Sequence, residues 1–304
     1  METEIKEYLH IDPRETLPRK LNELMLGAIA PRPIAFASTV DKEGNPNLSP
    51  FSFFNTFGIH PPILIFSPSR RGRNNTTKHT YENIREAPEV VINVVSYSMI
   101  QQVSLASAQF PKGVNEFVKA GFTMMKSDLI RPFRVGESPV QFECKVLQVI
   151  ETGHERFAGN LVISEMVKMH IDPGILTETG KIDPDKIDLV GRMGGNYYCR
   201  ASGGAVLEVE MPVDSIGIGV DKLPSHVRNS RILTGNDLGQ LANLESLPVE
   251  DSIKEVKQLA EVASLFETIR DQMERRDAIH RLAQRKIAEH QVGLALKILL
   301  LTEF

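Results

Sequence analysis

The hydrophobic pattern of this chain of 304 residues changes about two thirds of the way along, and no other feature constrains the fold as much. Before about residue 215, apolar residues come in short runs separated by turn residues, which predicts β-strands. After about residue 235, they recur every three or four residues, as on one face of an amphipathic helix. We therefore expect a mainly β domain over residues 1–215 and an α-helical extension over residues 216–304.

The first part should contain several short strands and a few short helices. Many short strands with turn signals between them are typical of a barrel or a sandwich. A helix over 16–26, with Gly27 as its stop signal, precedes the strands, and a helix over 81–86 ends before Pro88. The expected strands cover residues 34–40, 48–57, 63–67, 89–95, 140–150 and 160–171.

The second part reads as two helices. Apolar residues between Ile253 and Met273 recur at helical spacing, and a second helix is expected over residues 278–301. Two interpretations stay open, because periodicity does not name the surface that an apolar face covers. The helices could pack as a hairpin on their own β domain, or they could form a dimerisation arm or a lid.

Charge and composition exclude several classes of protein. The formal net charge is −4, so we expect neither nucleic acid nor an anionic membrane surface as a partner. Residues 1–10 lack the basic start and apolar run of a signal peptide, and the apolar stretch 294–301 is too short to cross a bilayer. We expect a cytoplasmic protein in which Cys144 and Cys199 stay reduced and are buried as small apolar residues.

Common catalytic and nucleotide-binding motifs are absent. The chain has no G-x-G-x-x-G after a strand, no P-loop motif and no G-x-S-x-G. Its eight histidines show no H-x-x-x-H spacing, and its two cysteines form no CxxC. The sequence therefore predicts no metal site, and we name no catalytic side chain.

A polar loop over residues 67–80 is the first candidate binding site. Hydroxyl and amide side chains surround its basic residues, and the start of a helix follows at once. Cations, hydroxyl donors and free helical amides at one place suit a phosphate, although a solvated basic loop would show the same residues. The basic residues are Arg70, Arg71, Arg73, Lys78 and His79.

The run from Asn47 to Asn55 is the second candidate. In one strand, Ser49, Phe51 and Asn55 would share a face. Pro50 has no amide donor, so this strand must lie at a sheet edge or be bulged there. An edge of this kind exposes backbone amides that suit the pyrimidine edge of a planar ring. The other interpretation is a core strand with ordinary Phe packing.

These segments belong to an ordered series of motifs between about residues 10 and 202. The series is Arg32–Thr39, Gly44-Asn45, Asn47–Phe54, Lys78-His79-Thr80 with Asn83-Ile84, Glu89–Val94, Gly113–Phe117, Ala120-Gly121-Phe122, Ser138–Cys144, Gly159–Ile163, Gly191–Gly195 and Tyr197-Tyr198. In order and spacing it resembles the flavin-reductase-like, FMN-binding split-barrel family. The residues after about 216 resemble nothing that we recognise.

The resemblance implies a split β-barrel with short helices that binds FMN near a homodimer interface. By position, it implies that Ser38 and Thr39 line the flavin, and that Ser49, Pro50, Phe51 and Ser52 border the isoalloxazine ring. It also implies that Ser67, Lys78 and Thr80 hold the phosphate, with Asn55 nearby. The family often has Lys-Asp-Thr where this chain has Lys78-His79-Thr80, and the histidine would add positive charge and alter the preference between FMN and a larger flavin.

The function implied is transfer of electrons from NAD(P)H to flavin or to a downstream acceptor, with a monooxygenase as a possible partner. The flavin supplies the hydride chemistry, which explains why no catalytic triad is present. Arg192, with Gly194 and Gly195, would meet the nicotinamide donor. His154 would contact a substrate or the flavin rim, or it is a structural histidine.

Two alternative functions stay open. One is a flavoredoxin-type electron carrier with tightly bound FMN and no direct reaction with NAD(P)H. The other is a non-catalytic flavin-binding protein whose helical extension recruits a partner.

Overall fold

The computed structural model describes residues 7–209 and 216–301. The chain forms two compact units, Met1–Leu207 (unit 1) and Glu208–Phe304 (unit 2), and each is described by itself. The boundary expected between residues 215 and 216 lies at the edge of the segment 210–215, outside the described residues. Within the described residues, no helix combines the length and the apolar character that a membrane crossing requires.

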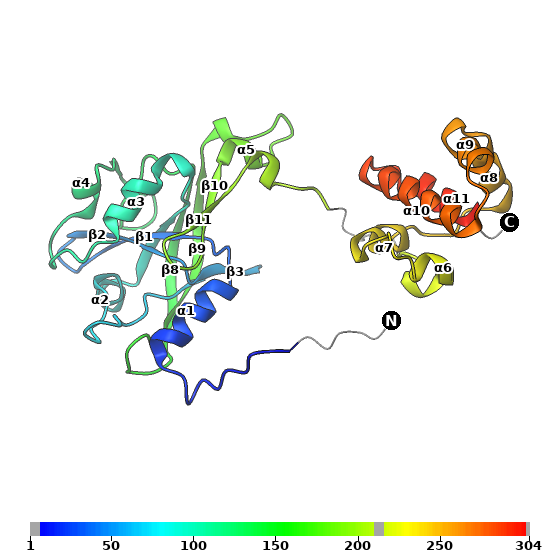
Figure 1. Ribbon diagram of the computed structural model, residues 1–304. Coiled ribbons are helices and arrows are strands. Elements are labelled where there is room, and N and C mark those ends of the chain that lie inside the picture. The colour runs from blue at the N-terminus through cyan, green and yellow to red at the C-terminus, as the bar shows by residue number, and fades with distance from the viewer. Residues whose placement is uncertain (1–6, 210–215, 302–304) are drawn as a thin grey trace. The chain divides into compact units, whose positions relative to one another are not determined.

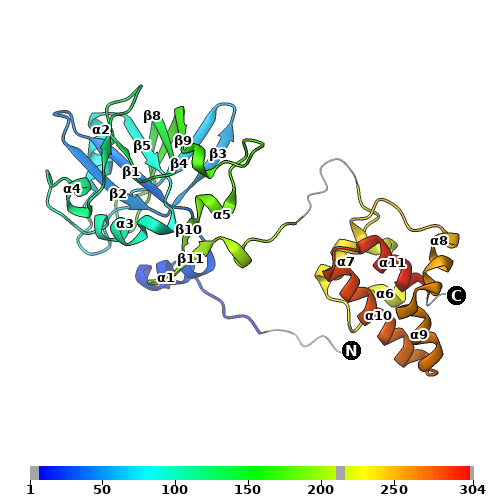
Figure 2. The ribbon, with the colours of Figure 1, turned by 90° about the horizontal axis from the view of Figure 1, so that it is seen from above.

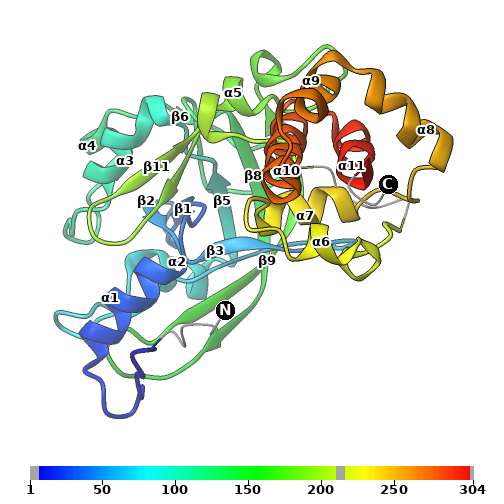
Figure 3. The same cartoon turned by 45° about the vertical axis from the view of Figure 1, so that its right-hand side comes forward.

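Unit 1 is built around one seven-stranded sheet in the order β2-β1-β5-β8-β9-β4-β3 (Figure 1). All neighbouring strands pair antiparallel. β8 and β9 form a long hairpin (Figure 3). The strands are β1 (Ala35–Val40), β2 (Pro46–Phe51), β3 (Phe54–Ile59), β4 (Pro62–Phe66), β5 (Glu89–Asn93), β8 (Val140–Glu151) and β9 (Asn160–Ile171).

The sheet must curl, because its two outermost strands follow each other in the chain. β2 ends at Phe51 and β3 begins at Phe54, so only two residues join the opposite edges. Three consecutive Cα–Cα steps span at most about 11 Å, and the two edges therefore approach each other at this point. The single strand expected over 48–57 is wrong, since the chain leaves one edge and enters the other. The edge position expected for Pro50 is confirmed.

Apolar side chains fill both faces of the sheet. One core gathers Ala37, Phe51, Phe66 and Val90, and α2 (His79–Glu86) adds Ile84 to it. The other core lies under α3 (Ile100–Ala106) and α4 (Glu116–Ala120), which lie side by side in Figure 1. Helices α3 and α4 both pack against β2, so this edge strand is bordered by helices.

Short elements complete unit 1. Helix α1 (Pro18–Ala28) continues through Gly27, so the expected stop at that glycine is wrong. A Cβ placed on Gly194 would lie 3.1 Å from the Cα of Gly27, which shows how closely the two backbones approach. The remaining short elements of unit 1 are η1 (Tyr97–Met99), β6 (Met124–Met125), β7 (Arg134–Val135), η2 (Pro173–Ile175), α5 (Pro184–Ile187), β10 (Leu189–Arg192), β11 (Tyr198–Ala201) and η3 (Gly203–Ala205).

Unit 2 is a helical body (Figure 2). It has its own hydrophobic core. Leu241, Val262, Leu282 and Leu299 are among the side chains buried in it. Of the apolar residues at helical spacing, Ile253, Val256 and Val262 are buried in this core, whereas Leu259 and Met273 are exposed. The elements are η4 (Val220–Lys222), α6 (Ser225–Arg228), α7 (Gly235–Ala242), α8 (Glu250–Glu255), η5 (Val256–Gln258), α9 (Ala260–Thr268), α10 (Gln272–Ala288) and α11 (Val292–Leu300).

The two long helices expected here are each divided. The stretch 253–273 is interrupted at Leu259 and Ile269, where the backbone is extended. The stretch 278–301 is divided by a turn in which His290 adopts a φ of 59°. Cys144 is buried as expected, whereas Cys199 is only half-buried.

Candidate functional site

A polar pocket lies beside the edge strand β2 in unit 1. Asn47 and Ser49 of β2 line one side, and Lys78, His79 and Thr80 at the start of α2 line another. Further lining residues are Arg71 from the loop 67–80, Glu116 of α4, and the segment 106–110 that begins at the end of α3. The pocket therefore joins both candidate segments of the sequence, the loop 67–80 and the strand that begins near Asn47.

The start of α2 offers hydrogen-bond donors to this pocket. Lys78 is the N-cap residue, and its side chain makes no capping hydrogen bond. The first amides of a helix have no intrahelical acceptor, and they carry the positive end of the helix dipole. The side-chain amide of Asn47 donates to Thr80 Oγ1 at 2.9 Å, which fixes this helix start against β2. An anion at this place would meet oriented donors.

Positive charge gathers in the pocket around Arg71, Lys78 and His79. Burial and the nearby Arg71 lower the pKa of Lys78, and the same two causes lead in lowering the pKa of His79. Arg71 donates from Nη1 to Thr76 Oγ1 at 3.0 Å and to the Thr77 carbonyl. Its Nε is buried without a hydrogen-bond partner. Crowded cations and an unpaired guanidinium donor are the features that a bound phosphate would satisfy.

Glu116 is the acid in the lining, and it does not neutralise this charge. It is buried, and its carboxylate accepts the backbone N–H of Leu48 at 3.1 Å. Burial raises the pKa of Glu116, so the environment disfavours its charged form. Sequence reasoning included Asn47 in a candidate segment, but it named neither Glu116 nor the segment 106–110 as pocket walls. No local signal could have found them, because tertiary packing brings α3 and α4 to β2.

The residues expected along the flavin lie on β1 and β2. Ser38 and Thr39 are fully buried. Ser38 Oγ has no hydrogen-bond partner, whereas Thr39 Oγ1 accepts from the Asn83 side chain at 3.1 Å. Phe51 packs in the core, with its ring centroid 5.6 Å from that of Phe66. Pro50 is half-buried on the edge strand β2.

Ser52 lies beside the segment 192–195. Arg32 Nε is 3.4 Å from Ser52 Oγ, and Arg32 Nη2 donates to the Met193 carbonyl at 2.9 Å. Arg192 stacks on the Tyr198 ring, with 4.5 Å between the guanidinium carbon and the ring centroid. The structure thus brings Ser52, Arg192 and the turn of Gly194 and Gly195 into one neighbourhood.

Of the expected flavin-site residues, Ser49, Lys78 and Thr80 line the pocket. Ser67, Asn55 and His154 do not line it. The Ser67 hydroxyl accepts the backbone N–H of Asn160 at 3.0 Å, so it ties β4 to β9. Asn55 is exposed on β3, and its side chain accepts the N–H of Thr56 at 2.8 Å. His154 is exposed and lies 3.6 Å from the Glu151 carboxylate. Their roles in binding stay predictions.

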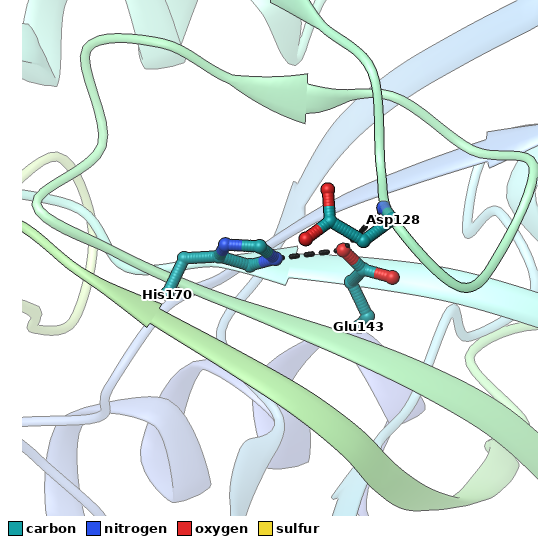
Figure 4. A group of neighbouring side chains, drawn as sticks. All are labelled: Asp128, Glu143 and His170. Carbon is teal, nitrogen blue, oxygen red and sulfur yellow. Dashed lines mark hydrogen bonds and ion pairs between the residues drawn. The ribbon is translucent and has the colours of Figure 1, made fainter.

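Asp128, Glu143 and His170 form a separate polar group (Figure 4). Their possible ligand atoms lie within 4.8 Å of one another, as a metal site would require. However, Glu143 already accepts the N–H groups of Asp128 and Leu129 at 2.8 and 2.7 Å. Asp128 is also paired with Lys168. The group is therefore better described as a Glu143–His170 pair, joined at 2.7 Å, than as a metal centre.

Comparisons with known proteins identify the family of this chain. A family model described as the flavin reductase like domain matches residues 26–182, just over half of the chain. An uncharacterized protein of Aquifex aeolicus (strain VF5) is 36% identical over 196 residues, which are 64% of this chain and 97% of that protein.

Solved structures are also similar to about two thirds of this chain. Nitrilotriacetate monooxygenase component B from Bacillus cereus is 28% identical, with a TM-score of 0.62 over 67% of this chain and 100% of that chain. A protein from Shewanella frigidimarina NCIMB 400 with a split barrel domain is 25% identical, with a TM-score of 0.56 over 67% of this chain and 100% of that chain.

Proposed function

This chain belongs to the flavin reductase-like domain family, and from that premise we propose that it is an FMN-binding oxidoreductase. It passes electrons from NAD(P)H to flavin or to a downstream acceptor. The pocket between β2 and the start of α2 carries this proposal, because Arg71 Nε is buried there without a hydrogen-bond partner among the described residues, and Lys78 is buried beside Arg71, whose charge lowers its pKa. A flavin phosphate would supply an anionic partner there.

The residues that would hold the phosphate are Arg71, Lys78, Thr80 and Ser49. Lys78 and Arg71 would donate charge-assisted hydrogen bonds, which are each worth about 1.5–3 kcal/mol. The first-turn amides of α2 would add donors aligned with the helix dipole. His79, in place of the family's frequent aspartate, removes a negative charge that would oppose the phosphate.

The isoalloxazine ring would extend along β2. Backbone carbonyls and side chains of β2 would meet the ring at this edge, because Pro50 has no N–H and the Leu48 N–H already donates to Glu116. Ser49, Pro50, Phe51 and Ser52 follow one another along this edge. The Ser38 hydroxyl, which is buried and unpartnered, supports a polar contact near β1.

FMN held by these residues would supply the hydride chemistry for oxidation of the reduced nicotinamide. The protein's part is to position the two rings and to exclude water, and positioning alone can contribute several kcal/mol to a transfer of this kind. Arg192, Gly194 and Gly195 lie beside Arg32 and Ser52, which supports them as the donor side of the site. No side chain is required as an acid or a base.

Further parts of the proposal concern assembly. The approach of the two sheet edges supports a split β-barrel, and we propose that it forms a homodimer in the cytoplasm. The name of the Bacillus cereus relative, a monooxygenase component, supports a partner monooxygenase that uses the reduced flavin. The β domain would cover residues 1–215 and the helical extension residues 216–304.

Replacing Lys78 tests the phosphate assignment. Lys78→Gln should weaken FMN binding by about tenfold, the effect of losing one charge-assisted hydrogen bond. It should leave riboflavin binding within about twofold, because riboflavin has no phosphate. Quenching of flavin fluorescence measures both affinities, and Lys119→Gln, a change at an exposed lysine of α4, is the matched control. An equal loss of FMN and riboflavin binding would contradict the assignment.

Steady-state turnover tests the reaction. The protein with free FMN should oxidise NADH or NADPH, and the preferred donor is the one with the larger kcat/KM. A protein that binds FMN but is reduced only by a protein donor would be an electron carrier instead.

A further inference from the structure

A second, larger pocket lies at the end of the sheet where β5 ends and β8 begins. Its volume is about 590 Å³, which is within the usual range for small-molecule sites. Arg134 of β7, His170 of β9 and Lys186 of α5 contribute its basic side chains. Its lining shares no residue with the pocket at the start of α2.

Arg134 is held in place by neutral groups. Its Nε and Nη2 donate to the Lys126 carbonyl at 3.2 and 3.0 Å, and its Nη1 donates to Gln141 Oε1 at 3.0 Å. A guanidinium has five N–H donors, so further donors remain after these three bonds. Within the described residues Arg134 forms no ion pair, and its charge is therefore available to an anion.

His170 is oriented by a buried carboxylate (Figure 4). Glu143 is fully buried. Burial works to raise the pKa of Glu143, but hydrogen bonds from Asp128 N, His170 and Leu129 N lower it overall. An ionised carboxylate only accepts hydrogen bonds, so the Nε2 of His170 carries the proton between them. Nδ1 is then left for a ligand in the pocket.

The acids of this pocket suit hydroxyl groups rather than a second cation. Both oxygens of Asp188 bind Arg200, at 2.7 and 2.8 Å, so that charge is already balanced. Asp172 and Glu137 accept backbone N–H groups and keep further lone pairs. Basic groups for phosphates together with carboxylates for ribose hydroxyls are the combination that recognises a nucleotide.

The remaining wall is apolar. Met125, Ile171 and Ile175 line it and could cover one face of a base. Lys186 donates to the Leu176 carbonyl at 2.8 Å, which holds its ammonium group at the pocket. The pocket thus offers surfaces for a base, a ribose and a diphosphate.

β10 leads from this pocket toward the donor side of the proposed flavin site. Asp188 lines the pocket, and Arg192 lies four residues further along, about 13 Å at the rise of a strand. Arg192 pairs with Arg32, whose Nε lies near Ser52. A dinucleotide, whose two nucleosides are joined by a diphosphate, can bind its two halves at separate places of this kind.

We propose that this pocket binds the adenosine diphosphate half of the nicotinamide donor, with Arg134 and Lys186 at its phosphates and with Nδ1 of His170 accepting a hydroxyl group. This rests on the proposed function, because it takes NAD(P)H as the electron donor. Arg134 and Lys186 are then binding residues, and Glu143 is a positioning residue that acts through His170.

Titration of the FMN-loaded protein with ADP-ribose, followed by calorimetry, tests this assignment. ADP-ribose should bind, and both Arg134→Gln and Lys186→Gln should weaken its binding by about tenfold. Arg131→Gln is the matched control, since Arg131 is in the same segment but pairs with Glu89 on the surface. Unchanged FMN affinity and unchanged circular dichroism show that each variant is folded. No binding of ADP-ribose at millimolar concentration, or equal binding by the wild type and both variants, would overturn the proposal.

Steady-state kinetics test whether the nucleotide that binds this pocket is part of the NAD(P)H donor. If the pocket serves the donor, ADP-ribose should raise the apparent KM for NADH or NADPH without lowering kcat, and Arg134→Gln should raise that KM by about tenfold at unchanged kcat. Binding of ADP-ribose that does not compete with the donor would overturn the assignment to the donor while the reductase activity stands. A protein that binds ADP-ribose through Arg134 but oxidises neither donor would refute the proposed function instead.

Discussion

At the scale of single residues, the chemistry of the candidate site could be predicted but its geometry could not. The cations and hydroxyls before α2 are visible in the sequence, and the structure brings Ser49, Lys78 and Thr80 to one pocket. Their role in binding flavin stays a prediction. Ser67 is also a hydroxyl residue, yet its hydroxyl accepts the backbone N–H of Asn160, which is distant in the chain. Such a contact depends on strand pairing, so no local pattern reports it.

His280 in unit 2 makes stability depend on pH. Burial, followed by the charge of His226, lowers the pKa of His280 to about 4. Its Nδ1 accepts from Ser230 Oγ at 2.7 Å, and its Nε2 is buried without a hydrogen-bond partner. Below its unfolded pKa of about 6.5, the unfolded chain takes up a proton that the folded unit does not. Stability should therefore be complete above pH 6.5 and fall as the pH drops toward about 4.

Hydrogen exchange of the α10 amides, corrected for the intrinsic rates, measures this loss. A single group can contribute a slope of at most about 1.4 kcal/mol per pH unit. His280→Asn keeps an acceptor for Ser230 and removes the titration, so the slope between pH 6.5 and 5 should become shallower. An unchanged slope would mean that other groups cause the pH dependence.

At the scale of elements, local patterns predicted the strands better than the C-terminal helices. The strand expected over 160–171 has the same bounds as β9, because alternation and turn residues are local signals. The stretch 253–273 has neither Gly nor Pro to indicate its breaks. Successive short helices that share one core keep the same apolar spacing, so periodicity continues through the breaks. The division of 48–57 into β2 and β3 arises from sheet topology, which a single strand's pattern does not contain.

The start of α7 offers a test at this scale. Thr234 and Asp237 form a capping box, in which Thr234 Oγ1 accepts the Asp237 N–H and the Asp237 carboxylate accepts the Thr234 N–H. Thr234→Ala should lower the unfolding free energy of unit 2 by about 1 kcal/mol, since a lost N-cap typically costs this much. Thr234→Ser keeps the hydroxyl and should cost less than half of that. Urea-dependent hydrogen exchange of the α7 and α11 amides compares them, and equal effects would argue against the capping box.

At the scale of the whole molecule, the family match lies in unit 1. The family model covers residues 26–182, and unit 2 has its own core outside that range. A sequence resemblance predicted the family because its motifs, on the strands, turns and helix starts of unit 1, keep their order and spacing along the chain. It could not predict the internal packing of unit 2, whose residues resemble nothing that we recognise.

The central claim is that the protein binds FMN and takes electrons from a reduced nicotinamide. The most direct test is the absorbance spectrum of the FMN-loaded protein during anaerobic addition of NADH and then of NADPH. We predict that the visible flavin bands bleach with at least one donor, and the faster donor identifies the preference. Flavin bands that stay unchanged with both donors, or a protein that binds no FMN, would contradict the account.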